Sequence, residues 1–412
     1  MRVTVTLIPA PALSPSNATD LALVQLLRRD WDADAPAPPT ATLDWTELVR
    51  KALHHGVAGL LCRALLALPD ADVPEDIREA ARLHLENVDA EGAERVRQTF
   101  DVLDTLAADD IAALPFKGVT LAAMAHASPN LRPSRDIDVL VHEDDMARSV
   151  ASLAKLGYRP RDVFSARIMR ASHASYGQDI LFARGRLPVE PHWAFAPGSY
   201  AVDLDLEGLW RRMIALPIAG RTVRALSPED TLLVACLHGA KEKWWRLLWV
   251  ADVAALVHRH PALDWSAIAQ RAAEAGMLRI LRLGLGLARA LFSIRLPEDL
   301  AEALERDEAC GRLIDECRRR IFDASGNPGS LFHVARFHWS ARERMRDRVR
   351  YAWRTVTTPR DIHYRMIALP DALVFGYVPL KLVHDYLLLP LWRLGKGRGA
   401  RRTRADVGVE GR

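Results

Sequence analysis

Hydrophobic positions along the chain recur with two different periods. Between residues 20 and 108 they follow the three-to-four-residue spacing of amphipathic helices, as in "LALVQLLRRDW" and "DWTELVRKALHHGVAGLLCRALLAL". The period then changes. "IAALPF" (111–116) and "DIDVLV" (136–141) are short apolar runs that predict strands, and "GVTLAAMAHA" between them predicts a helix. A helical region is therefore followed by an α/β unit.

The α/β pattern ends in a predicted hairpin, and the chain then returns to helical spacing. "EDDMARSVASLAKLG" predicts a helix that ends at Gly157, and "DILFARGRLPVEPHWAF" (179–195) predicts two strands on either side of Gly185. The sequence "SPED" from Ser227 predicts the start of a helix. The predicted divisions are an N-terminal helical region (1–108), an α/β core (109–226), a helical lobe (227–323), and basic and apolar C-terminal helices with a disordered tail (331–412).

Two acidic side chains alternate with apolar residues in the strand predicted over 136–141. Asp136 and Asp138 are two residues apart, so they project from the same face of a strand. Carboxylates this close repel each other, and the pKa of one rises unless a cation lies between them. By the same alternation, Glu190 and His192 share a face of the hairpin's second strand. If the two strands are neighbours, the three carboxylates can hold two Mg²⁺ ions about 3.5–4 Å apart.

A Lys-Gly pair stands upstream of the acidic strand, at the start of a predicted helix. Gly118 lets a phosphate approach the backbone, a helix N-terminus favours anions, and Lys117 supplies a positive charge. An Asp-x-Asp pattern also arises by chance, and Arg132 or Arg135 could neutralise the acids in simple ion pairs. The order of Lys-Gly, Asp-x-Asp and Glu-x-His along the chain favours a metal and triphosphate site.

The helical lobe offers further polar candidates. His238 and Lys241 lie on one predicted helix and Asp252 on the next, where they could face a nucleotide or make a polar contact between helices. His192 could likewise contact a nucleotide or bond to the backbone of its hairpin. The nearby tryptophans favour a core position over base stacking; they are Trp244, Trp245 and Trp249.

The motifs "FKGVTLAAM", "RPSRDIDVLV", "LAKLGY" and "VEPHW" resemble, in their order and spacing, the uncharacterised nucleotidyltransferase family of the polymerase-beta-like nucleotidyltransferase superfamily. "LDWTELVRKALHHGVAGLL" and "LSPEDTLLVACLHGAKEKWWRLLWVADVAAL" extend the resemblance over about residues 20–290. It implies an α+β fold, with a minimal nucleotidyltransferase core of a short mixed sheet and helices between N- and C-terminal helical regions. It also implies that Asp136 and Asp138 bind metal, with Glu190 as third acidic ligand. Most members of the superfamily at large have Gly-Ser where this chain has Lys117-Gly118.

These features predict an Mg²⁺-dependent nucleotidyltransferase. It would move a nucleoside monophosphate from an NTP, with ATP as the first choice, to a hydroxyl or phosphate of an acceptor, and release pyrophosphate. The acceptor could be a small molecule, a peptide or RNA. Two alternatives stay open: a kinase-like phosphotransferase on the same metal site, and a non-catalytic RNA-binding or scaffold protein on a decayed core. The residues expected to bind nucleotide are Lys117, Gly118, Arg135, His192, His238, Lys241 and Asp252.

The positive charge of the chain is concentrated near its C-terminus. The net charge is +4, yet residues 330–404 carry 16 Lys and Arg against 5 Asp and Glu. Seven arginines among aromatic residues over 336–354 fit an RNA contact or a solvated helix face. The apolar segment 366–394 is interrupted by charges and prolines, so no transmembrane span is expected. Together with "GKGRGARRTR" it predicts either weak peripheral contact with an anionic membrane or a packed helical hairpin with a disordered tail.

The four cysteines are scattered and form no Cys-x-x-Cys pair. This spacing argues against a zinc ribbon and against a disulfide framework, and it fits a reducing compartment. The expected location is the cytoplasm, with a peripheral position at the inner membrane face if the membrane contact forms.

Overall fold

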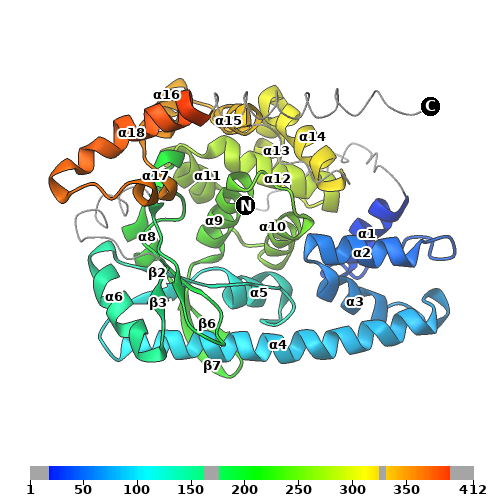
Figure 1. Cartoon of the computed structure of the whole chain (residues 1–412). Helices are drawn as coiled ribbons and strands as arrows, with labels where there is room; N and C mark the ends of the chain where they lie inside the picture. The colour runs from blue at the N-terminus through cyan, green and yellow to red at the C-terminus, as the bar shows by residue number, and fades with distance from the viewer. Residues whose placement is uncertain (1–17, 162–175, 324–330, 390–412) are drawn as a thin grey trace, which may run out of the picture.

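The computed structural model describes residues 18–161, 176–323 and 331–389, and its helices surround a small sheet (Figure 1). The N-terminal helices form where the apolar spacing predicts them. α2 begins after Asp44, whose carboxylate accepts a hydrogen bond from the N–H of Glu47 at 2.9 Å, and it ends at Gly56, whose φ is 72°. The elements of this region are α1 (Ala18–Arg29), α2 (Trp45–His55), α3 (Ala58–Leu66) and the 3₁₀ turn η1 (Asp70–Asp72).

The helix α4 (Glu75–Ala107) is 33 residues long and connects the N-terminal helices with the sheet. Figure 1 shows it running along one side of the molecule, past α3 at one end and α6 at the other. Its residues Val102 and Leu106 share a buried apolar cluster with Ile137 and Val139 of the sheet. The predicted boundary at residue 108 therefore follows a helix whose second half forms a wall of the α/β core.

The sheet contains the predicted strands and has the strand order β1-β2-β5-β4-β3. β2 and β5 are parallel, whereas the other neighbours are antiparallel, so the sheet is mixed. β4 and β5 are the predicted hairpin around Gly185. The strands are β1 (Ala113–Pro115), β2 (Ile137–Val141), β3 (Arg159–Pro160), β4 (Leu181–Phe182) and β5 (Val189–His192); the helical elements between them are α5 (Gly118–His126), η2 (Glu143–Asp145), α6 (Met146–Leu153) and η3 (Ala154–Leu156).

A second hairpin, which the apolar pattern did not reveal, follows the sheet. β6 (Ile214–Ile218) and β7 (Arg221–Ala225) pair antiparallel across a turn at Ala219 and Gly220, which both have positive φ. Ile218 packs with Val119 of α5 and Val96 of α4. The hairpin thus covers the helix that starts at the Lys-Gly pair. Two short helical elements precede it, η4 (Gly198–Tyr200) and α8 (Leu206–Arg211).

The helical lobe is built around the buried helix α12. α9, α10, α11 and α14 all contact it, and Trp244 is fully buried between Gly239 and Gly284. Ser227 begins α9 as predicted, because its hydroxyl accepts a hydrogen bond from the N–H of Asp230 at 3.2 Å. The helices are α9 (Pro228–Lys241), α10 (Leu247–Arg259), α11 (Trp265–Glu274), α12 (Leu278–Phe292), α13 (Glu298–Arg306) and α14 (Glu308–Phe322).

The C-terminal region consists of short helices on top of the lobe in Figure 1. They are α15 (Leu331–Ser340), α16 (Met345–Thr357), α17 (Asp361–Met366), the 3₁₀ segment η5 (Asp371–Gly376), α18 (Tyr377–Val383) and the π-helical turn η6 (His384–Leu388). Among the described residues, no helix is long and apolar enough to cross a membrane. Residues 324–330, between the predicted helical lobe and the predicted C-terminal helices, and residues 390–412, which include the predicted disordered tail, lie outside the described residues. The α+β fold class, with helices on either side of a short mixed sheet, is confirmed.

Candidate active site

The register of two parallel strands brings the acidic residues together. In the pairing of β2 with β5, Asp138 lies opposite Glu190 and Leu140 lies opposite His192. β5 is therefore the strand next to β2. A site with three carboxylates requires these two strands to be neighbours. Side chains alternate across a strand, so Glu190 and His192 point to the same side as Asp138.

Asp138, Glu190 and His192 form a compact group of possible metal ligands. One ligand atom from each lies within 4.8 Å of the others. The Nε2 atom of His192 is 2.9 Å from Oδ1 of Asp138 and 3.6 Å from Oε2 of Glu190. The other ring nitrogen, Nδ1, is 3.3 Å from the carbonyl oxygen of Ala194, a contact that orients the imidazole with Nε2 towards the acids.

Lys117 compensates the charge of the buried carboxylate. Its Nζ lies 2.8 Å from Oδ1 of Asp138. The Asp138 residue is only 5% exposed. Burial alone would raise the pKa of Asp138, but the Lys117 ammonium and the hydrogen bond from His192 hold this pKa well below its usual range. Asp138 is consequently ionised, and the Lys117 ammonium is the cation that pairs with it.

Asp136 has a different environment from Asp138. It lies just before β2 and outside the group of three, and the hydroxyl of Ser134 donates to its Oδ1 at 3.0 Å and to its carbonyl oxygen at 2.8 Å. Burial raises the pKa of Asp136, and the negative charges of Asp138 and Glu190 raise it further. One of the two acids thus has the raised pKa that their spacing predicts.

Gly118 opens α5 beside these acids. Its φ is 47°, in the left-handed region that favours glycine, and a Cβ there would lie 3.5 Å from Oγ of Ser134. Lys117, the N-cap residue of α5, makes no capping hydrogen bond with its side chain in the described structure. A small cavity beside this N-terminus is lined by Lys117, Gly118, Ser134, Asp136 and Asp138, among others. Lys-Gly and Asp-x-Asp therefore meet at one surface.

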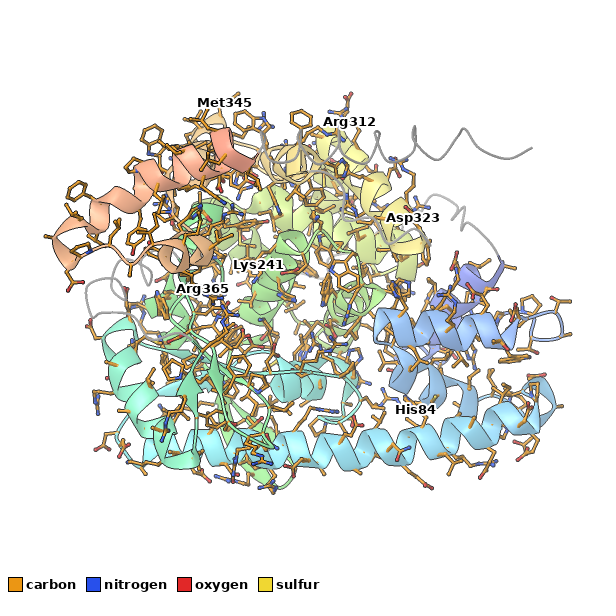
Figure 2. All side chains as sticks on the ribbon, in the orientation of Figure 1. His84, Lys241, Arg312, Asp323, Met345 and Arg365 are labelled. Carbon is orange, nitrogen blue, oxygen red and sulfur yellow. The ribbon has the colours of Figure 1, made fainter. Side chains whose placement is uncertain are left out.

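Two residues of the helical lobe face the same site. Burial lowers the pKa of Lys241, and the Lys117 ammonium lowers it further, whereas Asp138 and Glu190 act in the opposite direction. Burial and the same Lys117 charge lower the pKa of His238. Lys241 therefore lies within electrostatic reach of both strands, and Figure 2 labels it near the centre of the molecule.

His238 borders a second small cavity. Lys117, Arg132, Trp249 and Asp252 line it with His238. The Nδ1 atom of His238 is buried, and it has no hydrogen-bond partner in the part of the chain that the structure describes. The imidazole packs edge-on against Trp249, with 5.3 Å between the ring centroids. A buried imidazole nitrogen that lacks a hydrogen-bond partner is a candidate contact for a ligand.

The structure does not bring Asp252 and Arg135 into the acidic cluster. Both oxygens of Asp252 are bonded: Oδ1 to Nε2 of His126 and Oδ2 to Nε of Arg132, each at 2.9 Å. Asp252 thereby fixes α10 to α5 and to the loop before β2. Arg135 is exposed; burial lowers the pKa of Arg246, and the charge of Arg135 lowers it further.

Three residues that hold predicted residues in place were not themselves predicted. Gln178 donates a hydrogen bond to Oε2 of Glu190 at 2.6 Å and so orients that carboxylate. Ser134 orients Asp136, and a hydroxyl residue two positions before an acid could have indicated this turn. His126 bonds to Asp252. Nothing in the sequence signals the contacts of Gln178 or His126, because both depend on tertiary structure.

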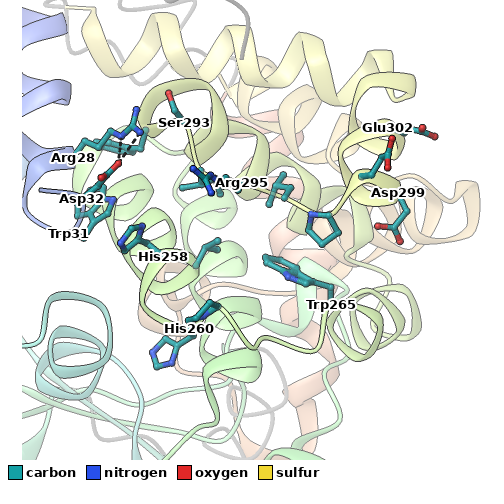
Figure 3. Close-up of a pocket in the computed structure, with 17 residues that line it drawn as sticks. Arg28, Trp31, Asp32, His258, His260, Trp265, Ser293, Arg295, Asp299 and Glu302 are labelled. Carbon is teal, nitrogen blue, oxygen red and sulfur yellow. Dashed lines mark hydrogen bonds and ion pairs between the residues drawn. The ribbon is translucent and has the colours of Figure 1, made fainter. Parts of the chain in front are cut away.

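A larger cavity lies elsewhere, between α1, the C-terminal ends of α10 and α12, and α13 (Figure 3). Its volume is about 1180 Å³, and its wall combines Trp31, His258, Trp265 and Arg295 with acidic residues of α13. It shares no lining residue with the two small cavities beside the acids. Size alone therefore does not locate the acidic site.

Residues 41–293, more than half of the chain, match a family of proteins described as uncharacterised nucleotidyltransferase. The chain belongs to this family. The residues that match the uncharacterised nucleotidyltransferase family include the sheet with both acidic strands and the helices α9 and α10. The matched region ends just after α12. The C-terminal helices lie outside it.

Other comparisons add little to this assignment. No functionally curated protein matches the chain. Among solved structures, the antibiotic-resistance factor ANT(2'')-Ia is similar at 13% sequence identity, with a TM-score of 0.32, over 44% of this chain and 91% of that chain.

Proposed function

We propose that this member of the uncharacterised nucleotidyltransferase family transfers a nucleoside monophosphate from an NTP to an acceptor hydroxyl or phosphate, with the help of Mg²⁺. In this reaction the acceptor oxygen forms a bond to the α-phosphorus, the bond to the β-phosphate oxygen breaks, and pyrophosphate leaves. The observation that carries the proposal is the register of Asp138 opposite Glu190, with His192 on the same side.

The side chains present fit a divalent cation. Asp138 and Glu190 offer carboxylate oxygens, which are the ligands that Mg²⁺ prefers, and His192 adds an imidazole nitrogen within the same 4.8 Å. Asp136 would complete the set from the edge of β2. When bound, the cation would supply positive charge to the phosphate oxygens and to the attacking oxygen.

The residues around this group have distinct proposed roles. Lys117 would exchange its contact with Asp138 for the triphosphate, and Gly118 would let a phosphate oxygen approach the first N–H groups of α5. Lys241 and His238 would contact the nucleotide from the lobe. Glu190, oriented by Gln178, would accept the proton that the acceptor loses.

Asp252 and Arg135 have weaker support as nucleotide ligands. Because the oxygens of Asp252 are bonded to Arg132 and His126, its proposed role is to hold α10 in place. Arg135 is exposed beside the acids and would meet the triphosphate only from outside.

The four free cysteines support a cytoplasmic location.

The identity of the transferred group can be tested with labelled nucleotides. The full-length protein is incubated with Mg²⁺ and each NTP, ATP first, labelled at the α- or the γ-phosphate, with and without cell extract as a source of acceptors. Nucleotidyl transfer attaches the α-label to an acceptor and releases the γ-label in pyrophosphate. A γ-label on the acceptor would instead identify a kinase-like reaction. No transfer and no Mg·NTP binding would favour the scaffold alternative.

A further inference from the structure

The C-terminal helices carry most of the exposed large apolar side chains. Across residues 18–161, 176–323 and 331–389, fifteen of the nineteen such side chains lie between Phe332 and Leu388. Scattered exposed apolar residues are ordinary, but a concentration of them marks a contact with another surface. The family match ends before this region, at residue 293.

α16 shows the arrangement most clearly, because it carries an apolar stripe on its solvent side. Met345, Val349, Trp353 and Val356 recur every three or four residues, so they share one face of the helix. Their exposures are 60%, 56%, 68% and 36%. Tyr351, on another face, is buried. Figure 2 shows Met345 at the outer edge of the molecule.

The neighbouring elements continue this surface. α18 packs beside α16 in Figure 1. On α18 and η6, five consecutive or nearly consecutive apolar residues are exposed by 37–58%, and Phe375 of η5 is exposed by 68%. The exposed residues of α18 and η6 are Leu382, Val383, Tyr386, Leu387 and Leu388. The surface formed by α16, η5, α18 and η6 is called the C-terminal face below.

Charge decides between the possible occupants of the C-terminal face. Residues 331–389 contain ten Lys and Arg against five Asp and Glu. Without the buried Arg342, Lys381 and Asp347, eight basic residues remain against four acidic ones, and the following residues 390–412 contain seven against two. A second copy of the chain, or the segment 390–412 itself, would bring charge of the same sign to the face. RNA would match the charge, and its bases could stack on Trp353 or Phe375, but it offers no complement to the exposed aliphatic side chains that make up most of the face.

An anionic lipid surface matches both properties, because its headgroups attract Lys and Arg and its acyl boundary accepts apolar side chains. We propose that the C-terminal face docks this protein on an anionic membrane as a peripheral, interfacial contact. The proposal is independent of the reaction that the acidic site catalyses.

Ion pairs and aromatic contacts join the C-terminal face firmly to the core. The Arg342 guanidinium lies between two aromatic rings, 4.6 Å from the ring centroid of Tyr200 and 4.1 Å from that of Tyr351. Arg350 pairs with Asp203, and Arg354 donates to the carbonyl oxygen of Gly198 at 2.9 Å. Docking of this face would therefore fix the orientation of the whole protein on the membrane.

The test is flotation of the full-length protein with vesicles of phosphatidylcholine alone or mixed with phosphatidylglycerol. The protein should bind the phosphatidylglycerol vesicles at low salt, and added salt should weaken the binding steeply. The triple variant Trp353→Ser, Phe375→Ser, Leu387→Ser should bind at least about tenfold more weakly, because it removes three apolar side chains that the lipid would bury; a tenfold loss corresponds to about 1.4 kcal/mol.

A matched control separates the C-terminal face from apolar exposure in general. Leu53→Ser, Leu83→Ser removes two leucines that are 58% and 52% exposed on other helices, and it should bind like the wild type. Deleting residues 395–412 should also weaken vesicle binding, because the deleted segment carries six Lys and Arg against two Asp and Glu. Circular dichroism and melting temperature confirm that each variant is folded.

Three results would overturn the proposal. The first is wild-type protein that ignores phosphatidylglycerol vesicles at low salt, and the second is a triple variant that binds them as well as the wild type. The third is a dimer, measured by light scattering, that the triple variant converts to a monomer, because this would assign the face to a second copy. RNA binding without vesicle binding, measured by gel shift, would assign the basic charge to nucleic acid.

Discussion

Asp138 and Glu190 lie opposite each other on the parallel strands β2 and β5, with Nε2 of His192 2.9 Å from the first carboxylate and 3.6 Å from the second. The two acids are separated by more than fifty positions in the sequence. The strands β3 and β4 come between β2 and β5 along the chain, yet β5 is the neighbour of β2 in the sheet. A functional site of this kind depends on register, since a slip by one residue would turn Glu190 to the opposite face.

The first prediction concerns the different environments of the two strand acids. Asp138→Asn breaks a buried ion pair with Lys117, so it should lower the free energy of unfolding by about 3 kcal/mol. Asp136→Asn should not lower it and should raise it slightly, because ionised Asp136 is repelled by Asp138 and Glu190. Repulsion between the acids, considered from sequence alone, would predict no loss of stability for either substitution.

Urea unfolding in EDTA across a pH series checks this prediction. The pKa of folded Asp138 is lowered, so its contribution is present above the unfolded value of about 3.9 and is lost as the pH falls below it. The pKa of folded Asp136 is raised, so the advantage of Asp136→Asn exists at neutral pH and disappears below about 3.9. Equal destabilisation by both substitutions would contradict the account.

The second prediction separates the acceptor side from the triphosphate side. Glu190→Gln should lower kcat by about 10²–10⁴, because the carboxylate that takes the acceptor's proton is lost. The affinity for Mg·NTP should change only a few-fold. Rapid-quench kinetics and a fluorescent-nucleotide titration measure the two quantities. A collapse of nucleotide binding in this variant would place Glu190 on the triphosphate instead.

The third prediction concerns the ammonium of Lys241. Its pKa is lowered by burial and by Lys117, so the charge should be lost at a pH below the usual value of about 10.4. NTP affinity should consequently fall as the pH rises through this lowered pKa. Lys241→Met should bind NTP more weakly at neutral pH and lack this step, whereas Lys241→Arg should keep the affinity.

The control for Lys241 is Lys155→Met, which removes an exposed ion pair with Asp109. It should leave nucleotide affinity unchanged at every pH. If Lys241→Met binds NTP as tightly as the wild type, Lys241 is not a triphosphate ligand.

The fourth prediction uses the left-handed backbone of Gly118. Gly118→Ala should cost about 1–2 kcal/mol of stability, because φ is 47° there, and it should also weaken NTP binding by obstructing the approach to α5. Gly56→Ala, at a φ of 72° on the end of α2, provides the matched control. It should lose similar stability while NTP affinity stays unchanged. Thermal melts and nucleotide titrations compare the two variants.

Much of the α/β core could be predicted, because local patterns specify its elements. The strands at 113–115 and 137–141, the helix after Lys117, and the hairpin around Gly185 form where period and turn residues indicate them. The adjacency of β2 and β5 could only be stated as a condition, since parallel pairing joins distant segments without a local signal. The hairpin β6–β7 was not predicted, because its strands show no clear alternation of apolar and polar residues. Only a few of its side chains, such as Ile218 and Val223, are buried against α4 and α5, and most of the others are exposed or half-buried.

The basic C-terminal region shows why composition is a weaker guide than position. Its arginines and aromatics fit RNA binding in sequence, yet Phe337 and Tyr351 are buried, and Arg342 stacks between tyrosines inside the protein. Asp252 is similar: its place on a lobe helix suggested a nucleotide contact, but His126 and Arg132 occupy its oxygens. Neither outcome follows from spacing, because both depend on which helices pack together.

The proposed role of Asp138 as a ligand of the divalent cation that accompanies the NTP is the assignment on which the reaction depends most. It can be tested without knowing the acceptor, by electron paramagnetic resonance of Mn²⁺ titrated with the protein and a non-hydrolysable NTP analogue. The wild type should remove the signal of free Mn²⁺ in the presence of the analogue, and folded Asp138→Asn should lose most of this binding. An Asp138→Asn variant that binds Mn²⁺ and the analogue as tightly as the wild type would contradict this assignment.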